Sequence, residues 1–309
     1  MALLFKKSIL RTGTKLFNRF RTGAGRFLLA AVFFSMLLIS GCDKSASKVT
    51  IYLKGSDTMV NLCQRWAEAY MKVNPNVRVV VTGGGSGNGI TALLNGSADF
   101  ACMSRELLPA EIKRAETRGI KLTSVKTAFD GITIAVNSSN IIEELSLNDL
   151  KGLFTGKIKN FRAVGGDDLP VNLYGRDNNS GTYTIFKEMI LKGEDFASAT
   201  QVLQGTAALA EAVAGDKRGI AYGGIGYFIK KSGIKIVKIK GDADGKSKSP
   251  VEEDHPNYEE IRSGQYLISR PLLLISRSQK KAGMEEFINF ILSGEGQKIV
   301  AGMNYIPLN

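Results

Sequence analysis

Residues 79–96 read VVVTGGGSGNGITALLNG and join two patterns through a glycine-rich turn. An apolar run at 77–81, VRVVV, precedes the turn and is typical of a fully buried strand, while a short helical pattern near 87–95 follows it. A strand that leads through a tight turn into a helix is the repeating unit of α/β proteins. Helix N-termini carry unpaired N–H groups that suit an anion, and glycine lets the backbone come close to it. The stretch therefore predicts an α/β fold with an anion at this turn.

The turn does not match a nucleotide-binding motif. Gly84 and Gly89 have the spacing of a Walker motif, but Ile90 stands where the motif needs lysine. The GxGxxG pattern fails as well, because Asn88 and Ile90 fall where its last glycine would be. The candidate anion is therefore not expected to belong to a nucleotide.

Strand and helix patterns alternate along the rest of the chain, which favours a mainly parallel sheet. Six apolar residues of the helix expected at 57–72 recur at helical spacing: Met59, Leu62, Cys63, Trp66, Ala67 and Tyr70. Further strands are expected at 49–55, 98–102, 131–137, 171–175, 218–224, 234–241 and 266–276. Further helices are expected at 109–119, 146–156, 181–192 and 206–215, with one terminal helix at 281–303.

The N-terminus has the pattern of an export signal. Residues 1–26 hold seven Lys or Arg and no acid, and an apolar segment, FLLAAVFFSMLLIS, follows. This segment is shorter than the roughly twenty residues that span a bilayer. ISGC resembles a bacterial lipobox, which implies a signal peptide at 1–41, a lipidated Cys42 and a tether at 42–48. Asp43 resembles an inner-membrane retention signal, and an uncleaved anchor is the alternative.

The remaining composition argues against several classes of protein. The formal charge of the whole chain is +12, but subtracting the seven charges of the export signal leaves only +5. No basic block interleaved with aromatic residues remains, so we expect no nucleic-acid partner. Cys63 and Cys102 lie in apolar patterns and are expected to be buried thiols, with a disulfide as the alternative. We expect no metal or other cofactor, because there is no CxxC and the single histidine, His255, lies in a polar surface segment.

Four turns repeat one design: each follows a predicted strand, and at least three of them open a helix. Ligands of open α/β sheets bind beyond the carboxyl ends of the strands, so these turns are expected to share one site. A serine or threonine at a helix start is by itself an ordinary cap. The evidence is that four such turns occur together, with an arginine beside a Ser-Gly-Thr sequence. The candidate ligand-binding residues are Ser56, Asp57, Thr58, Ser86, Gly87, Ser104, Arg105, Arg176, Ser180, Gly181 and Thr182.

The motifs GSDTM, GGGSGNGI, SRELLPAEI, DGITIAVN, LKGLFTGKIKNF, GRDNNSGTYTIF and SRPLLLIS, in this order, resemble the PstS family, the phosphate-binding proteins of bacterial Pst ABC transporters. The resemblance implies the two-lobed α/β fold of type II periplasmic binding proteins, which closes over phosphate. Lobe one is then expected at 45–130 plus 270–309 and lobe two at 131–269, joined by crossing strands in DGITIAVN and YLISRPLLLIS. It also implies a monomer outside the cytoplasm that delivers phosphate to a membrane permease with a cytoplasmic ATPase.

Two positions depart from the family pattern. Well-known members have an aspartate where this chain has Ser104, and another where it has Asn178. The first departure removes the expected acceptor for the proton of phosphate, so Asp57 and Asp130 become the candidates for that role. Such an acceptor would reject sulfate, which has no proton to donate.

Other functions remain as alternatives. The two departures keep open a receptor for another oxyanion, or a phosphate sensor or adhesin on the same fold. A phosphatase would need an activated nucleophile or a metal cluster, and the sequence offers neither, so no catalytic residue is expected.

Overall fold

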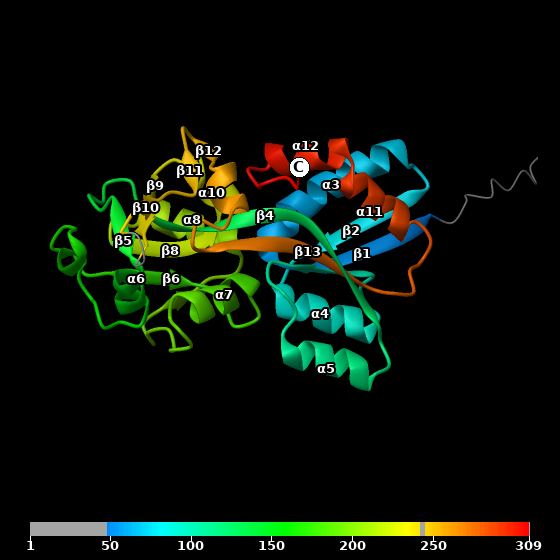
Figure 1. The fold of residues 1–309 in the computed structure, drawn as a ribbon, viewed down its shortest axis with the longest axis horizontal. Helices are drawn as coiled ribbons and strands as arrows, with labels where there is room; N and C mark the ends of the chain where they lie inside the picture. The colour runs from blue at the N-terminus through cyan, green and yellow to red at the C-terminus, as the bar shows by residue number, and fades with distance from the viewer. Residues whose placement is uncertain (1–47, 242–244, 309) are drawn as a thin grey trace, which may run out of the picture. The chain divides into compact units, whose positions relative to one another are not determined.

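A computed structural model describes residues 48–241 and 245–308, and Lys48–Asn309 group as one compact unit. The predicted signal peptide, Cys42 and almost all of the tether lie outside the described residues. The strands are β1 (Val49–Gly55), β2 (Val77–Thr82), β3 (Phe100–Met103), β4 (Leu122–Asn137), β5 (Glu144–Ser146), β6 (Asn172–Gly175), β7 (Gln201–Val202), β8 (Gly219–Gly224), β9 (Ile234–Lys240), β10 (Ser247–Lys248), β11 (Val251–Glu252), β12 (His255–Pro256) and β13 (Ser269–Arg277). The helices are η1 (Asp57–Met59), α3 (Val60–Val73), α4 (Ser86–Asn95), α5 (Pro109–Thr117), α6 (Leu147–Phe154), η2 (Phe161–Val164), α7 (Gly181–Met189), α8 (Thr206–Gly215), α9 (Ile225–Phe228), α10 (Tyr258–Arg262), α11 (Met284–Leu292) and α12 (Gly294–Gly302), with labels as in Figure 1.

The described residues form a long mixed sheet with the strand order β2-β1-β3-β13-β4-β8-β6-β7, while β9 pairs with β4, β5 and β10. β1 is parallel to β2 and β3, and β6 is parallel to β7 and β8. β13 runs antiparallel to β3 and β4, and β4 runs antiparallel to β8 and β9. The expectation of a mainly parallel sheet is therefore wrong at its centre, because both β13 and β4 run antiparallel to their neighbours there.

The long strand β4 changes partners along its length. Residues 122–131 pair with β13, and residues 132–137 pair with β8 and β9. Both β4 and β13 thus run through the middle of the molecule (Figure 1). The strand starts well before the predicted 131, because residues 122–130 are largely polar and lack the alternation that indicates a strand. The division into two lobes at this point remains a proposal.

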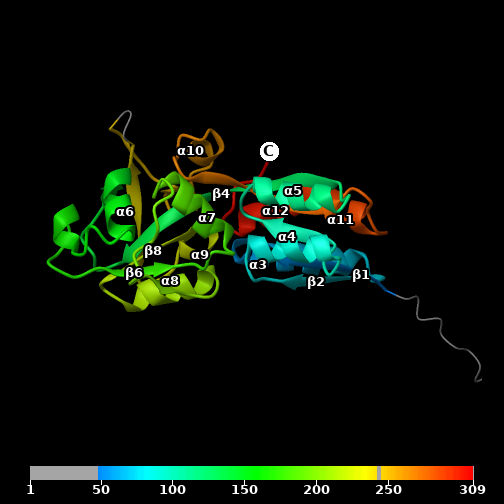
Figure 2. The same cartoon turned by 90° about the horizontal axis from the view of Figure 1, so that it is seen from below.

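Side chains alternate between the two faces of β1, β2, β3 and β13, so each face of this part of the sheet carries an apolar layer. Phe100 and Cys102 of β3 belong to the core under α3, while Ala101 and Met103 belong to the core under α4. Figures 1 and 2 show α3, α11 and α12 on one face of these strands and α4 and α5 on the other. All six residues of the predicted apolar stripe on the first helix are buried.

Two other expectations are corrected by the structure. β2 is an edge strand in which only Val79 is fully buried, so VRVVV is not a buried strand; its apolar residues pack on one face only. The single terminal helix is two helices, because Ser293 adopts an extended conformation (φ −69°, ψ 166°) and its Oγ accepts the N–H of Gly296 as the cap of α12. The helical apolar spacing continues across this break, which is why the pattern concealed it.

Candidate functional site

Polar residues from all four predicted turns are buried in one place. Ser56 precedes η1, Ser86 begins α4, Ser104 follows β3, and Ser180 caps α7. The buried polar residues of this site are Ser56, Thr58, Ser86, Ser104, Arg105, Asp130, Arg176, Ser180, Thr182 and Arg270. Burial of so many polar groups requires partners for their hydrogen-bonding atoms.

Three serines join the turns that follow β1, β2 and β3. The Oγ of Ser56 donates to the Oγ of Ser104 at 2.8 Å, and the N–H of Ser104 donates to the Oγ of Ser86 at 3.2 Å. The two hydroxyls of Ser86 and Ser104 are 3.4 Å apart. The strand ends therefore meet as the parallel arrangement of these three strands predicts.

The start of α7 lies directly against these serines. A Cβ atom on Gly181 would come within 2.6 Å of the Ser86 Oγ and 2.7 Å of the Ser104 Oγ. A side chain larger than glycine would therefore separate α7 from the serines. The N–H of Gly87 donates to the carbonyl of Asn179 at 3.0 Å, which adds a backbone contact between the glycine turn and the loop before α7.

The Ser180 hydroxyl acts as the N-cap of α7. Its Oγ accepts the N–H of Tyr183 at 3.3 Å. This is the ordinary capping role that the sequence allowed for any one of these serines. The helix that it caps begins with Gly181 and Thr182, so the N-terminus of α7 faces the serine cluster.

Asp57 and Arg176 form an ion pair across the site. The Arg176 side chain is 1% exposed and the Asp57 side chain 18% exposed. The other carboxylate oxygen of Asp57 accepts the N–H of Gly84 at 2.7 Å, and Arg176 also donates to the Thr206 hydroxyl at 3.3 Å. Asn178 is exposed and carries no charge, and Asp57 supplies the counter-charge of this arginine.

Two tyrosines hold the backbone of the first turn. Tyr227 of α9 donates to the Asp57 carbonyl at 2.8 Å, and Tyr305, after α12, donates to the Thr58 carbonyl at 2.6 Å. Burial raises the pKa of Tyr227 to about 12, so its hydroxyl keeps its proton at neutral pH. The turn that carries Asp57 is thus fixed by segments far away in the chain.

Sequence analysis missed Arg270, a buried arginine on β13. It donates to the hydroxyls of Thr182 at 2.9 Å and Thr58 at 3.3 Å, and to the carbonyl of Ser104 at 3.2 Å. The two threonine hydroxyls are 3.2 Å apart. A lone charge in the apolar stretch YLISRPLLLIS was the signal that could have identified this residue.

Asp130 is the partner of Arg270 and lies opposite it in the strand pairing. Its Oδ2 accepts two hydrogen bonds from the guanidinium, at 2.7 and 2.9 Å, and its Oδ1 accepts the N–H of Ile225 at 3.1 Å. Burial raises the pKa of Asp130, opposed by the guanidinium of Arg270 and the N–H groups of Ile225 and Gly131. The carboxylate is thus already engaged by three donors.

Arg105 points its guanidinium at an acid rather than at the serines. Two of its nitrogens donate to the two carboxylate oxygens of Glu111, each at 2.8 Å, and both side chains are about 5% exposed. Glu111 also accepts the N–H of Leu108 at 2.9 Å at the start of α5. Arg105, a candidate ligand-binding residue from the sequence, is thus paired with an acid in the structure.

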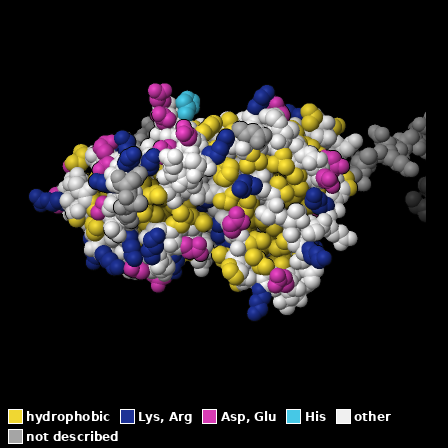
Figure 3. All heavy atoms as spheres, viewed as in Figure 1, with side chains coloured by type: hydrophobic (Ala, Val, Ile, Leu, Met, Phe, Trp, Pro, Cys, Tyr) yellow, Lys and Arg dark blue, Asp and Glu magenta, His cyan; other side chains and the backbone are white. Residues whose placement is uncertain are grey.

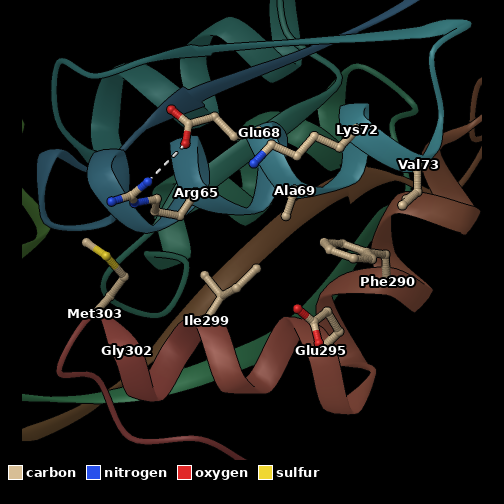
Figure 4. A pocket seen from close by; sticks show the side chains of 10 residues that line it. All are labelled: Arg65, Glu68, Ala69, Lys72, Val73, Phe290, Glu295, Ile299, Gly302 and Met303. Carbon is tan, nitrogen blue, oxygen red and sulfur yellow. Dashed lines mark hydrogen bonds and ion pairs between the residues drawn. The ribbon is translucent and has the colours of Figure 1, made fainter.

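The groove drawn in Figure 4 is elsewhere. It has a volume of about 570 Å³, lies between α3 and the two C-terminal helices, and is lined by none of the predicted site residues. His255, the single histidine, is exposed, and Figure 3 shows it on the surface. Among residues 48–241 and 245–308, no cluster of three or more His, Cys, Asp or Glu could hold a metal ion, and no helix has the length and apolarity to cross a membrane.

Comparison with known proteins places this geometry in a family. The family model of the PBP superfamily domain matches residues 43–295. The phosphate-binding protein PstS of Pseudomonas aeruginosa is 32% identical over 271 residues, which cover 82% of this chain and 81% of that protein. The protein of the same name from Staphylococcus epidermidis is 31% identical over 251 residues, covering 79% and 74% of the two chains.

A solved structure leads to the same assignment. The ABC-type phosphate transport receptor from Vibrio cholerae aligns with a TM-score of 0.65 and 28% identity, over 83% of this chain and 99% of that one. The chain therefore belongs to the PstS family of the PBP superfamily and has the type II periplasmic-binding-protein fold.

Proposed function

We propose that this chain is a receptor outside the cytoplasm that binds inorganic phosphate and delivers it to an ABC transporter. The observation that carries the proposal is that hydroxyl groups from four turns meet at the start of α7, while Arg176, which follows β6, pairs with Asp57 of the first of these turns. Relatives that bear the name phosphate-binding protein PstS, and the phosphate transport receptor from V. cholerae, support the choice of ligand.

The chemistry of the site suits a tetrahedral oxyanion. Phosphate oxygens accept hydrogen bonds, and hydroxyl groups, helix N-terminal N–H groups and a guanidinium donate them. Arg270 donates to the oxygens of Thr58 and Thr182, and one of these hydroxyls donates to the other, which leaves the proton of the second hydroxyl for a ligand. Arg176 supplies the charged contact, and Asp57 balances its charge.

Asp57 is our candidate for the acceptor of the phosphate proton. It lies in the first turn, it is partly exposed, and it touches Arg176. Both carboxylates already accept hydrogen bonds inside the protein, but Asp130 is less suited to this role because its side chain is 0% exposed and accepts three of them, whereas the Asp57 side chain is 18% exposed and accepts two. Acceptance of the ligand's proton by Asp57 would favour phosphate over sulfate.

We further propose that two lobes, 45–130 plus 270–309 and 131–269, close over the ligand by bending at β4 and β13. The protein catalyses no reaction in this mechanism. It acts as a monomer, tethered to the cell membrane through lipidated Cys42, and docks on permease subunits that are served by a cytoplasmic ATPase. The lobe-crossing strands and the family support closure; the anchor rests on the N-terminal sequence alone.

The first test is calorimetric titration of residues 44–309, stripped of ligand by partial unfolding, with phosphate and then with sulfate. Micromolar or tighter phosphate binding without a sulfate response is the expected result. Arg176→Ala should weaken phosphate binding about 100-fold or more, because it removes charge-assisted hydrogen bonds of about 1.5–3 kcal/mol each. Arg162→Ala is the matched control, because it also removes an arginine side chain but one that is 76% exposed. Wild-type affinity in Arg176→Ala would remove this arginine from the site.

Asp57→Asn tests the selectivity. We expect the ratio of the phosphate affinity to the sulfate affinity to fall at least about tenfold. In the variant, phosphate loses the carboxylate that accepts its proton, and sulfate no longer faces a carboxylate to which it cannot donate. An unchanged ratio would place the acceptor elsewhere, with Asp130 the next candidate. A stronger response to another oxyanion in the wild type would instead favour the alternative receptor suggested by Ser104 and Asn178.

A further inference from the structure

Two buried cysteines lie in contact behind the candidate site. The sulfur atoms of Cys63, in the first turn of α3, and Cys102, on β3, are 3.6 Å apart. Cys63 is 0% and Cys102 3% exposed. Neither thiol takes part in the proposed binding of phosphate, so the pair is a chemical feature that the receptor function does not explain.

The folded protein protects these thiols from reaction. The hydrogen bond with Cys102, followed by burial, raises the pKa of Cys63 well above its ordinary value, so the reactive thiolate is scarce. Burial also blocks approach of an external oxidant or reductant. Whatever redox state the pair has when the core closes is therefore the state that the folded protein keeps.

We propose that Cys63 and Cys102 form a disulfide when the chain folds outside the cytoplasm. A thiolate of one cysteine attacks the disulfide of a thiol–disulfide oxidoreductase or a small disulfide and forms a mixed disulfide. The second thiolate then attacks the bonded protein sulfur and releases the other sulfur of the oxidant. The two cysteines lose two electrons and two protons, and the oxidant's disulfide becomes two thiols. The inference rests on the proposed extracytoplasmic location for its oxidant.

The position of the pair gives the bond a structural effect. The two cysteines are 39 positions apart, and the segment between them contains β2, the glycine turn and α4. The carbonyl of Cys102 accepts the N–H of Ser56 at 2.8 Å, and Cys63 lies in the first turn of α3, which directly follows Asp57 and Thr58 of η1. The bond would therefore fasten together the segments that carry three of the four binding turns, before any ligand arrives.

The test follows the pair through folding. The full-length chain, purified in detergent and reduced in urea, is refolded either with a mixture of reduced and oxidised glutathione or with dithiothreitol. Thiols are then alkylated in urea, and peptides are mapped by mass spectrometry. We expect a Cys63–Cys102 crosslinked peptide from the glutathione sample only. Complete alkylation of both cysteines after refolding in glutathione would overturn the proposal.

A second experiment tests formation of the disulfide in the cell, with protein recovered from its native membrane. After direct denaturation and alkylation, the crosslinked peptide should dominate; two fully alkylated thiols would overturn formation of the bond in the cell. The oxidised wild type should also melt about 5–15 °C above both its reduced form and the variant Cys63→Ala/Cys102→Ala, because the bond closes a loop of about 40 residues. Equal melting temperatures of oxidised and reduced protein would refute the stabilising role. Phosphate titration of the same samples is independent, so failure of the bond and failure of the receptor proposal are separable.

Discussion

Arg270→Gln is expected to destabilise the protein strongly and in a pH-dependent way. In the wild type, Arg270 and Asp130 share two hydrogen bonds of 2.7 and 2.9 Å, and their side chains are 1% and 0% exposed. Removing one partner leaves an uncompensated buried charge, which costs about 3–5 kcal/mol. For a chain of this size the melting temperature should fall by about 10 °C.

The pH dependence follows from the carboxylate that remains. Without the guanidinium that lowers it, the pKa of Asp130 in the folded variant rises further above the value of 3.8 in an unfolded chain. The folded variant then binds this proton more tightly than the unfolded variant does, so its stability increases as the pH falls. Its deficit relative to the wild type should be largest at pH 8 and should shrink by up to about 1.4 kcal/mol per pH unit below the variant's Asp130 pKa.

The assay is urea unfolding of residues 44–309 between pH 5 and 8, followed by the fluorescence of Trp66, the single tryptophan, which is fully buried. A second variant, Arg270→Gln/Asp130→Asn, should recover part of the stability and lose the pH dependence. Arg162→Gln breaks an exposed pair and should cost less than about 1 kcal/mol. A deficit below about 1 kcal/mol in Arg270→Gln, or one of equal size at pH 5 and pH 8, would refute the reasoning.

Two further predictions concern the start of α7 and a surface acid. Gly181→Ala should weaken phosphate binding, measured by calorimetry, at least about tenfold, because its methyl group would displace the hydroxyls of Ser86 and Ser104, which lie within 2.7 Å. The control is Gly215→Ala on α8, whose methyl group meets no neighbour and should leave the phosphate affinity unchanged. Hydrogen bonds from Lys151, and then from Lys157, lower the pKa of Glu194 to about 2, so carboxyl NMR should show this group titrating near that pH. The folded pKa lies below the unfolded value of 4.5. The contribution of this cluster to stability is therefore present above pH 4.5 and is lost as the pH falls toward 2. A midpoint near 4.5 would contradict the cluster.

Local signals in the sequence were sufficient for most of the longer helices and for the four turns, but not for the break between α11 and α12 or for the short helices α9 and α10. The helix that carries Trp66 was predicted from apolar spacing, and Ser146 was predicted as the start of α6, where its Oγ accepts the N–H of Asp149. The turns after β1, β2 and β3 meet because these strands are neighbours, and the start of α7 reaches them through the contact between the Thr58 and Thr182 hydroxyls. The helices and the residue types of the turns depend on residues close together in the chain, whereas the meeting of the turns depends on the order of the strands.

Partners distant in the chain could not be predicted. Arg270 meets Asp130 only because β13 returns beside β4, 140 residues away in sequence. The ion pair between Asp57 and Arg176 likewise joins residues that are 119 positions apart, so the sequence near position 178 does not show which residue neutralises the charge of this arginine. The edge position of β2 was missed because an apolar run does not tell whether a strand has one neighbour or two.

The late return of β13 also determines the order in which the molecule can be completed. β3 has β1 on one side and needs β13 on the other, and α3 is covered by α12, with the Trp66 indole donating to the Gly296 carbonyl at 2.9 Å. Both partners belong to the last 41 residues of the chain. While the chain emerges from a ribosome or a translocation channel, the N-terminal strands therefore keep an open sheet edge and an uncovered apolar helix until synthesis or transport is nearly finished. A chain that lacks only these residues should bind holding chaperones and aggregate, although most of its strands are present.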